Sequence, residues 1–219
     1  MTYYVPVMLN LFQRRCIIIG GGLVAERKVA PLLDAGADIV LISPTITATL
    51  QQVYEERRIE WVNRRYQSGD LEGAFLVFAA TDHSETNQMI VEESNFLGIP
   101  VNHTGDGESG SFITPSVLRR QELVIAVSTS GAGPTASRNL CEDINKHYGD
   151  HYEEYIQFLS SVRSEVKRTV HHEGLRKKIF RSLADMEILS EIAKGNFRQW
   201  SQYEISQWID SWIEGHREE

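Results

Sequence analysis

Apolar and polar positions follow two different periods in the first part of the chain. Residues 16–19 form a short, mostly β-branched apolar run that ends in three glycines, and residues 23–33 then change to helical spacing. A second apolar run at 38–43 stops at Pro44, which completes a strand, a helix and a strand in under 30 residues. We expect these strands to pair in parallel, because an antiparallel hairpin would not need the intervening helix.

The same alternation continues toward the middle of the chain. Apolar runs at 59–62, 75–80 and 99–102 predict three further strands, and residues 86–97 have helical spacing. Strands that alternate with helices are typical of an α/β protein, in which helices cover both faces of a parallel sheet. The pattern therefore predicts a Rossmann-like, doubly wound parallel sheet.

After the fifth predicted strand the pattern changes. Apolar runs at 111–114 and 123–128 predict two strands with charged residues at their junction, 119–122, either as a hairpin or as a pair exchanged with another copy. A helix is expected over 134–147, because the proline at its start suits the first turn of a helix. The remaining residues show helical spacing only, which predicts a helical C-terminal domain.

Composition narrows the classes of partner. The 219 residues include 22 basic and 30 acidic side chains, for a net charge of −8, so no net positive field favours nucleic acid or an anionic membrane. No uncharged run approaches the roughly 20 residues that cross a bilayer. The segment from Met1 to Phe12 lacks the features of an export signal, and we expect a cytoplasmic protein.

The cysteines and histidines do not predict a metal site. Cys16 and Cys141 lie far apart, one entering an apolar run and the other in a helical pattern, and neither belongs to a zinc-binding spacing. We interpret both as core thiols. The histidines in the C-terminal half lie in charged helical stretches and do not join a recognisable set of metal ligands.

The glycines after the first strand predict a dinucleotide site. Gly20, Gly22 and Ala25 fit the pattern G-x-G-x-x-A, in which the first glycine makes the turn, the second admits a pyrophosphate and the small third residue allows close packing. Leu23 and Val24 begin the helix, whose unpaired N–H groups and partial positive charge bind an anion without a lysine. The motif follows a strand and opens a helix, which is the context it requires.

The end of the second strand favours NAD over NADP. Ser43, Pro44 and Thr45 stand where a Rossmann fold commonly carries an acidic residue for the ribose hydroxyls. Hydroxyl groups of Ser43 and Thr45 are candidates for that contact, and their alternative interpretation is as turn residues. No arginine stands beside them to hold a 2′-phosphate.

Two polar residues follow the strong strand at 75–80. Thr81 lies where open α/β sheets place their ligand crevice, and we assign it to the cofactor site. We expect Asp82 to cap the following helix, and the alternative is that it approaches the cofactor.

Several ordered blocks of residues together resemble one family. The chain is similar to the precorrin-2 dehydrogenases, which include the N-terminal part of multifunctional sirohaem synthases, from its start to about Arg138. The blocks that carry this resemblance are 17–28, 79–82, 87–88, 111–116 and 126–131.

The resemblance implies a reaction and an assembly. Precorrin-2 would give a hydride to NAD⁺ and lose a proton, forming sirohydrochlorin for sirohaem or cobalamin synthesis. Family members are homodimers with interlocking central segments, which implies an NAD-binding domain over 1–113, a dimerisation segment over 114–149 and a helical domain over 150–219. The methyltransferase domain of the multifunctional enzymes is expected to be absent.

A tetrapyrrole with many carboxylates implies a local basic rim. Arg119, Arg120 and Arg138 are candidates for it, and the alternative is that they are solvated surface arginines.

Two residues are candidates for the proton that leaves the substrate. In some relatives that also insert Fe²⁺, an aspartate follows the fifth strand, and ungapped counting from residues 111–113 places it at Gly105. Asp106 is adjacent, and either it substitutes for that aspartate or the segment is a simple turn. His103 is the second candidate, since imidazole titrates near neutral pH.

Two other functions remain open at this point. One is a bifunctional precorrin-2 dehydrogenase and sirohydrochlorin ferrochelatase. The other is a regulatory module that binds a dinucleotide and signals to a protein partner through the helical tail.

Overall fold

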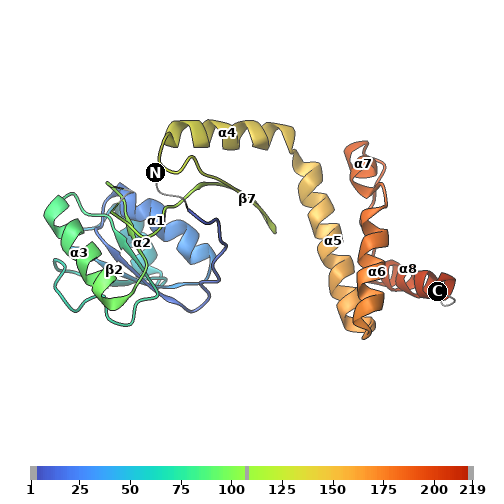
Figure 1. The fold of residues 1–219 in the computed structure, drawn as a ribbon, viewed down its shortest axis with the longest axis horizontal. Coiled ribbons are helices and arrows are strands. Elements are labelled where there is room, and N and C mark those ends of the chain that lie inside the picture. The colour runs from blue at the N-terminus through green and yellow to red at the C-terminus, as the bar shows by residue number, and fades with distance from the viewer. Residues whose placement is uncertain (1–3, 107–108, 217–219) are drawn as a thin grey trace. The chain divides into compact units, whose positions relative to one another are not determined.

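The computed structural model describes residues 4–106 and 109–216, and its chain divides into two compact units. Unit 1 comprises Met1–Thr114 and Ser128–Gly133, and unit 2 comprises Pro115–Val127 and Pro134–Glu219. Figure 1 shows the strands and helices of both units.

Unit 1 contains a five-stranded, all-parallel sheet in the order β3-β2-β1-β4-β5. The order runs outward from β1 in both directions, so the predicted doubly wound sheet is confirmed. Nearly every residue of the central strands is buried, which explains their continuous apolar runs. The strands are β1 (Arg15–Ile19), β2 (Asp38–Ile42), β3 (Glu60–Val62), β4 (Leu76–Ala79) and β5 (Val101–His103).

Helices cover both faces of this sheet (Figure 1). Helices α1 (Leu23–Asp34) and α2 (Ala48–Glu55) pack with the strand residues that face one side, such as Ile18. Helix α3 (Ser84–Leu97) packs with those that face the other side, such as Ile17. Successive strand residues point to opposite faces, and both faces are therefore apolar cores.

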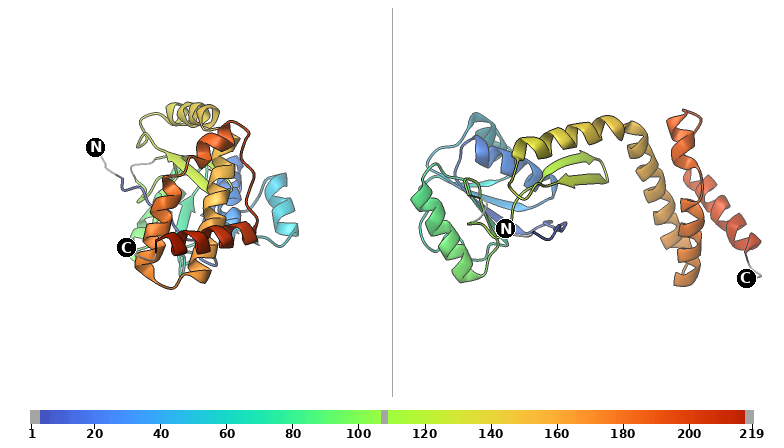
Figure 2. Two further views of the ribbon diagram at one scale, coloured as in Figure 1. Left: turned by 90° about the vertical axis from the view of Figure 1, so that its right-hand side faces the viewer. Right: turned by 45° about the horizontal axis from the view of Figure 1, so that its top comes forward.

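Unit 2 combines a hairpin with helices, which Figure 2 shows from two further directions. Helix α5 packs against α6, α7 and α8 around a core that contains Phe158 and Val162. The antiparallel strands of the hairpin contact α4. The elements are β6 (Ser116–Arg120), β7 (Leu123–Val127), α4 (Pro134–His147), α5 (Asp150–Thr169), α6 (Glu173–Ala184), α7 (Ile188–Ala193) and α8 (Gln202–Gly215).

The first strand of the hairpin lies later in the chain than its predicted position. The prediction of a strand at 111–114 is wrong, and Arg119 and Arg120 belong to β6 rather than to the turn. The segment at 111–114 lies beside β5 through mixed contacts: Ser111 donates its N–H to the Val101 carbonyl (2.8 Å) and its hydroxyl oxygen accepts from Val101 N–H (2.7 Å). A side chain replaces part of the ladder, and no regular strand forms.

Both cysteines are buried free thiols, as expected. Burial raises the pKa of the Cys16 thiol to about 11, so this thiol is neutral at physiological pH. Within 4–106 and 109–216, no helix combines the length and apolar character needed to cross a bilayer.

Candidate functional site

The glycine turn between β1 and α1 is packed so closely that two of its positions exclude a side chain. Gly20 has φ +119°, and a Cβ there would lie 2.2 Å from the Ala80 carbonyl oxygen. A Cβ on Gly21 would lie 2.0 Å from the Thr45 carbonyl oxygen. These glycines bring the end of β1 against the chain that leaves β4 and β2, and this contact fixes where α1 begins.

Gly22 differs from its two neighbours because the space beside it is open. A Cβ at this position would meet nothing within 4 Å, and the backbone is extended (φ −84°, ψ −172°). Gly22 is the N-cap of α1, and no side chain caps the helix. The first intrahelical bond runs from Glu26 N–H to the Gly22 carbonyl (3.1 Å), so the N–H groups of 23–25 precede it.

A pyrophosphate fits this cradle. Gly22 leaves room for a close approach of the phosphates to the backbone, and the first turn of α1 offers its N–H groups and partial positive charge. Ala25 is fully buried against the sheet, so the helix packs closely on β1. Leu23, Val24 and Ala25, assigned from the sequence, all belong to this first turn.

The turn after β2 supports the glycine turn from the side. Ser43 is buried, and its hydroxyl donates to the Thr45 carbonyl (2.7 Å) while its carbonyl accepts from Trp61 Nε1 (2.9 Å). The Ser43 hydroxyl thus closes this turn, and Pro44 and Thr45 remain exposed beside it. The hydroxyl group of Thr45 is the accessible one of the two candidates for the ribose.

Asn87 on α3 fixes the end of β4. Its side-chain oxygen accepts from the Thr81 hydroxyl (2.7 Å) and from Thr81 N–H (3.2 Å), and its amide nitrogen donates to the Thr81 carbonyl (3.0 Å). Asn87 is 4% exposed. In the sequence, Asn87 belongs to the block 87–88 and has no assigned role. A buried polar residue in a helix nevertheless needs hydrogen-bond partners of this kind.

Asp82 does not cap α3, contrary to the prediction. The N-cap residue is His83, without a side-chain cap bond, and the Asp82 side chain is exposed with its carboxylate 3.6 Å from His83 Nε2. The Thr81 hydroxyl oxygen instead accepts from His83 N–H (3.2 Å). The side chain that contacts the backbone at the start of α3 is therefore Thr81 and not Asp82.

His103 and Asp106 come together at the end of β5. His103 Nδ1 accepts from Asp106 N–H (2.7 Å) and from Gly105 N–H (3.2 Å), so the neutral ring carries its proton on Nε2. The Asp106 carboxylate is exposed and accepts from the Ser109 hydroxyl (2.5 Å). This loop lies at the same carboxyl-terminal edge of the sheet as Gly22 and Thr81, which is where parallel sheets bind ligands.

Asn102 of β5 lies one residue before this loop and is buried. Its amide nitrogen donates to the Phe112 carbonyl (2.9 Å), and its oxygen has no partner within the part of the chain that the structure describes. The Phe112 ring packs edge-on against Phe78 at 5.5 Å between centroids. Asn102 therefore ties the segment at 111–114 to the sheet, a role that sequence reasoning missed.

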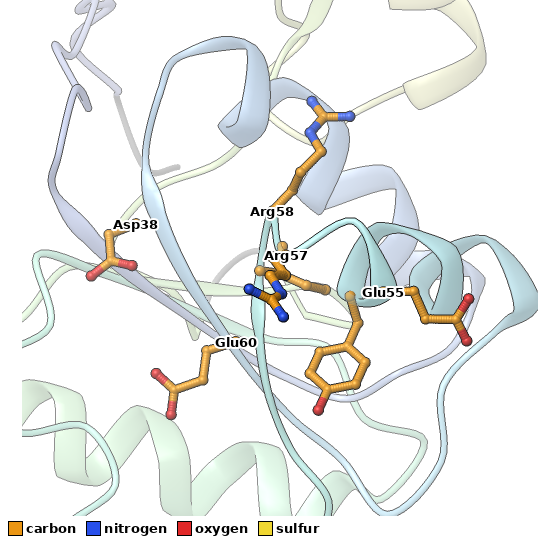
Figure 3. A pocket seen from close by; sticks show the side chains of 7 residues that line it. Asp38, Glu55, Arg57, Arg58 and Glu60 are labelled. Carbon is orange, nitrogen blue, oxygen red and sulfur yellow. The ribbon is translucent and has the colours of Figure 1, made fainter.

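A depression of about 450 Å³ elsewhere on unit 1 does not coincide with these residues. It contains Asp38, the first residue of β2, and Glu60, the first residue of β3, so it lies near the amino-terminal ends of these strands. Figure 3 shows its labelled charged side chains spread around it rather than pointing to a common centre. In the described residues, no group of three or more His, Cys, Asp and Glu side chains is placed to hold a metal ion.

Comparison with known proteins supports a dinucleotide site at the glycine turn. Residues 7–116 match a family model described as NAD(P)-binding. The precorrin-2 dehydrogenase of Bacillus subtilis (strain 168) is 35% identical over 141 residues, which cover 64% of this chain and 86% of that protein. The chain belongs to the precorrin-2 dehydrogenase family.

Other relatives of this family extend the match over more of the chain. The siroheme synthase of Photobacterium profundum is 31% identical over 192 residues, which cover 88% of this chain and 41% of that protein. The chain thus spans about two fifths of the length of the siroheme synthases that it matches. The solved structure of SirC, a precorrin-2 dehydrogenase, superposes with a TM-score of 0.76 and 25% identity over 95% of this chain and 100% of that one.

Proposed function

We propose that this protein oxidises precorrin-2 to sirohydrochlorin with NAD⁺ as the hydride acceptor. The proposal rests on membership of the precorrin-2 dehydrogenase family, and the observation that carries it is the open space at Gly22 beside the first turn of α1. The substrate gives up one hydride and one proton, so the products are sirohydrochlorin, NADH and H⁺. The bound dinucleotide supplies the acceptor for the hydride.

In this proposal the glycine turn binds the diphosphate. Gly20 shapes the turn and Gly22 leaves room for the phosphates, while the N–H groups of 23–25 stabilise their charge. Thr45 lies beside the ribose, and the absence of an acidic group or an arginine in 43–45 favours NAD⁺ over NADP⁺. Thr81, held by Asn87, lines the crevice at the end of β4.

The loop after β5 receives the proton. We assign the proton to the exposed carboxylate of Asp106, because a carboxylate is a general base when it lies within hydrogen-bonding reach. His103 holds the backbone at Asp106, since its Nδ1 accepts from Asp106 N–H, and the Ser109 hydroxyl donates to the carboxylate. Precise placement of the hydride donor contributes more to the rate than this base does.

We also propose that the protein is a homodimer through the hairpin of β6 and β7. Apolar residues such as Val117 (51% exposed) are open on this two-stranded sheet, and a hairpin of two strands needs further packing to be stable. Sedimentation equilibrium would give the mass of two chains, whereas a single-chain mass at micromolar concentration would contradict the dimer.

The decisive test is an anaerobic assay with precorrin-2. The purified protein is incubated with precorrin-2 and either NAD⁺ or NADP⁺, and the absorbance of sirohydrochlorin and of the reduced nicotinamide is followed. We expect both signals to rise together, and faster with NAD⁺. Binding of NADH without any turnover of precorrin-2 would reject the dehydrogenase and support a dinucleotide sensor.

A further inference from the structure

Lys28 lies on α1 one turn after Ala25, on a side of the helix that faces the sheet. Its ammonium donates to the Thr114 hydroxyl (2.6 Å) and lies 5.9 Å from the centroid of the Phe78 ring in β4. Lys28 is half-buried, and Thr114 is exposed. The charged end therefore stops at the surface of unit 1, next to the segment at 111–114 that Asn102 ties to β5.

This ammonium has no acidic partner. Within the described part of the chain, no carboxylate oxygen lies within 4.0 Å of Lys28 Nζ, and its one hydrogen-bond partner is a neutral hydroxyl. Burial and the nearby positive charge of Arg27 lower the pKa of Lys28. A half-buried charge without a counter-ion is unfavourable, and such groups gather at binding sites.

The neighbouring cation on the same helix behaves differently. Arg27 is exposed, and its guanidinium donates to the Leu23 carbonyl of its own helix (3.3 Å). Solvent compensates the charge of Arg27, whereas Lys28 is partly removed from solvent and points toward β4. Arg27 therefore serves as a comparison for Lys28 on the same helix, because only Lys28 lies against Phe78 and Thr114.

We propose that the Lys28 ammonium binds an anionic oxygen of a bound reactant, and that Thr114 holds it in place until the reactant arrives. This inference rests on the proposed function, whose two reactants carry such oxygens: the carboxylates of the tetrapyrrole and the phosphates of the dinucleotide. The contacts with β4 and Thr114 favour a carboxylate of the tetrapyrrole, because the diphosphate cradle lies at the first turn of α1. Candidates for a basic rim chosen from the sequence did not include Lys28. One of those candidates, Arg120, is instead paired with Asp150 (3.0 Å) and Asn145 within unit 2.

The test compares three variants: Lys28→Met removes the charge, Lys28→Arg keeps it, and Arg27→Met is the matched control. Binding of sirohydrochlorin is titrated anaerobically by absorbance, binding of NAD⁺ is measured by calorimetry, and KM and kcat for precorrin-2 are determined. We expect Lys28→Met to weaken sirohydrochlorin binding and to raise KM by about tenfold or more, the usual effect of losing a charged hydrogen bond. Lys28→Arg should retain most of the affinity, and Arg27→Met should stay within about twofold of the wild type.

The outcomes distinguish a tetrapyrrole carboxylate from a dinucleotide phosphate. They also distinguish failure of the Lys28 inference from failure of the proposed function. Weaker binding of sirohydrochlorin alone supports a tetrapyrrole carboxylate, and weaker binding of NAD⁺ alone supports a phosphate. Unchanged binding of both in Lys28→Met overturns the inference, as does an equal loss in Arg27→Met. If Lys28→Met does not fold, the test rests on Lys28→Arg, which keeps the charge. Retained affinity in that folded variant supports the inference, and a complete loss of its affinity overturns it. Absence of precorrin-2 turnover by the wild type defeats the proposed function, while the two binding titrations still test Lys28.

Discussion

A buried carboxylate in unit 2 and several polar groups around α1 and β5 in unit 1 differ in how completely they are paired. In unit 2, Glu165 of α5 is 4% exposed, and its carboxylate accepts hydrogen bonds from Arg168 (2.5 and 3.0 Å), from the Ser206 hydroxyl (2.6 Å) and from Gln202 (3.2 Å). These bonds, above all those from Arg168, lower the pKa of Glu165 to about 2. The carboxylate therefore joins α5 to α8 as part of the packed structure.

In unit 1, several polar groups around α1 and β5 are only partly paired within the described chain. No side chain caps the first turn of α1, Lys28 donates to a neutral hydroxyl rather than to a carboxylate, and the oxygen of Asn102 has no donor. A fully satisfied buried group stabilises the fold, and an unsatisfied one at a crevice is available to a ligand. The difference predicts which substitutions change stability and which change binding or turnover.

The largest expected effect is on turnover, at Asp106. Asp106→Asn keeps the size of the side chain and removes the carboxylate base, so kcat for precorrin-2 should fall by about 100-fold, within the usual range for a general base. The affinity for NAD⁺ and the thermal midpoint should change little, because the side-chain oxygen of asparagine can still accept from the Ser109 hydroxyl. Stopped-flow absorbance under anaerobic conditions measures kcat. A kcat close to that of the wild type would mean that water takes the proton.

The next largest effect concerns Gly22 and its neighbour Gly21. In Gly22→Val the new side chain occupies open space, so the fold should persist, while affinity for NAD⁺ falls by roughly one to two orders of magnitude through overlap costing about 1–3 kcal/mol. Gly21→Ala places a Cβ 2.0 Å from the Thr45 carbonyl oxygen and should lower the thermal midpoint instead. Calorimetry and thermal melting distinguish the two. Unchanged NAD⁺ affinity in Gly22→Val would remove the pyrophosphate from this turn.

Glu165 should show the opposite behaviour. Its folded pKa, about 2, lies below its ordinary value of 4.5, so its contribution to stability is complete above about pH 4.5 and is lost as pH falls toward 2. Glu165→Gln should lower the thermal midpoint at pH 7, and the difference from the wild type should shrink in acid. Affinity for NAD⁺ at pH 7 should be unchanged. Glu191→Gln, which removes an exposed ion pair with Lys194, is the control and should have a smaller effect. A constant difference between pH 7 and pH 3 would contradict this role for Glu165.

The elements of unit 1 were predictable because their signal is local. Apolar runs such as 16–19 are buried on both faces of the sheet, and the glycines after them are required by the close approach of Ala80. The segment at 111–114 misled the prediction, since its pairing with β5 uses the Ser111 hydroxyl and is not visible in a hydrophobic pattern. Lys28 belongs to the block 17–28 that carries the family resemblance, but its position in the sequence indicated no role for it. A lysine in a helix is usually solvated, and its contact with Thr114 joins residues 86 positions apart.

Asn87 combines a structural role with a place near the candidate site, and its substitution has the smallest expected effect. It is buried and hydrogen-bonded like Glu165, yet its bonds hold Thr81 at the end of β4 in unit 1. Asn87→Ala leaves the Thr81 backbone groups without their partner, a loss of about 1–3 kcal/mol, and should lower the thermal midpoint by a few degrees. Thr81 would also lose its fixed position, so NAD⁺ affinity should fall by only a few-fold.

Thr81→Ala separates these two effects. It removes the hydroxyl and keeps the two backbone bonds to Asn87, so the thermal midpoint should stay closer to that of the wild type. If Asn87→Ala loses stability but binds NAD⁺ as the wild type does, the end of β4 does not contact the cofactor, and Thr81 is a structural residue. If both variants weaken NAD⁺ binding equally, the hydroxyl itself is the contact, and the role of Asn87 is to orient it.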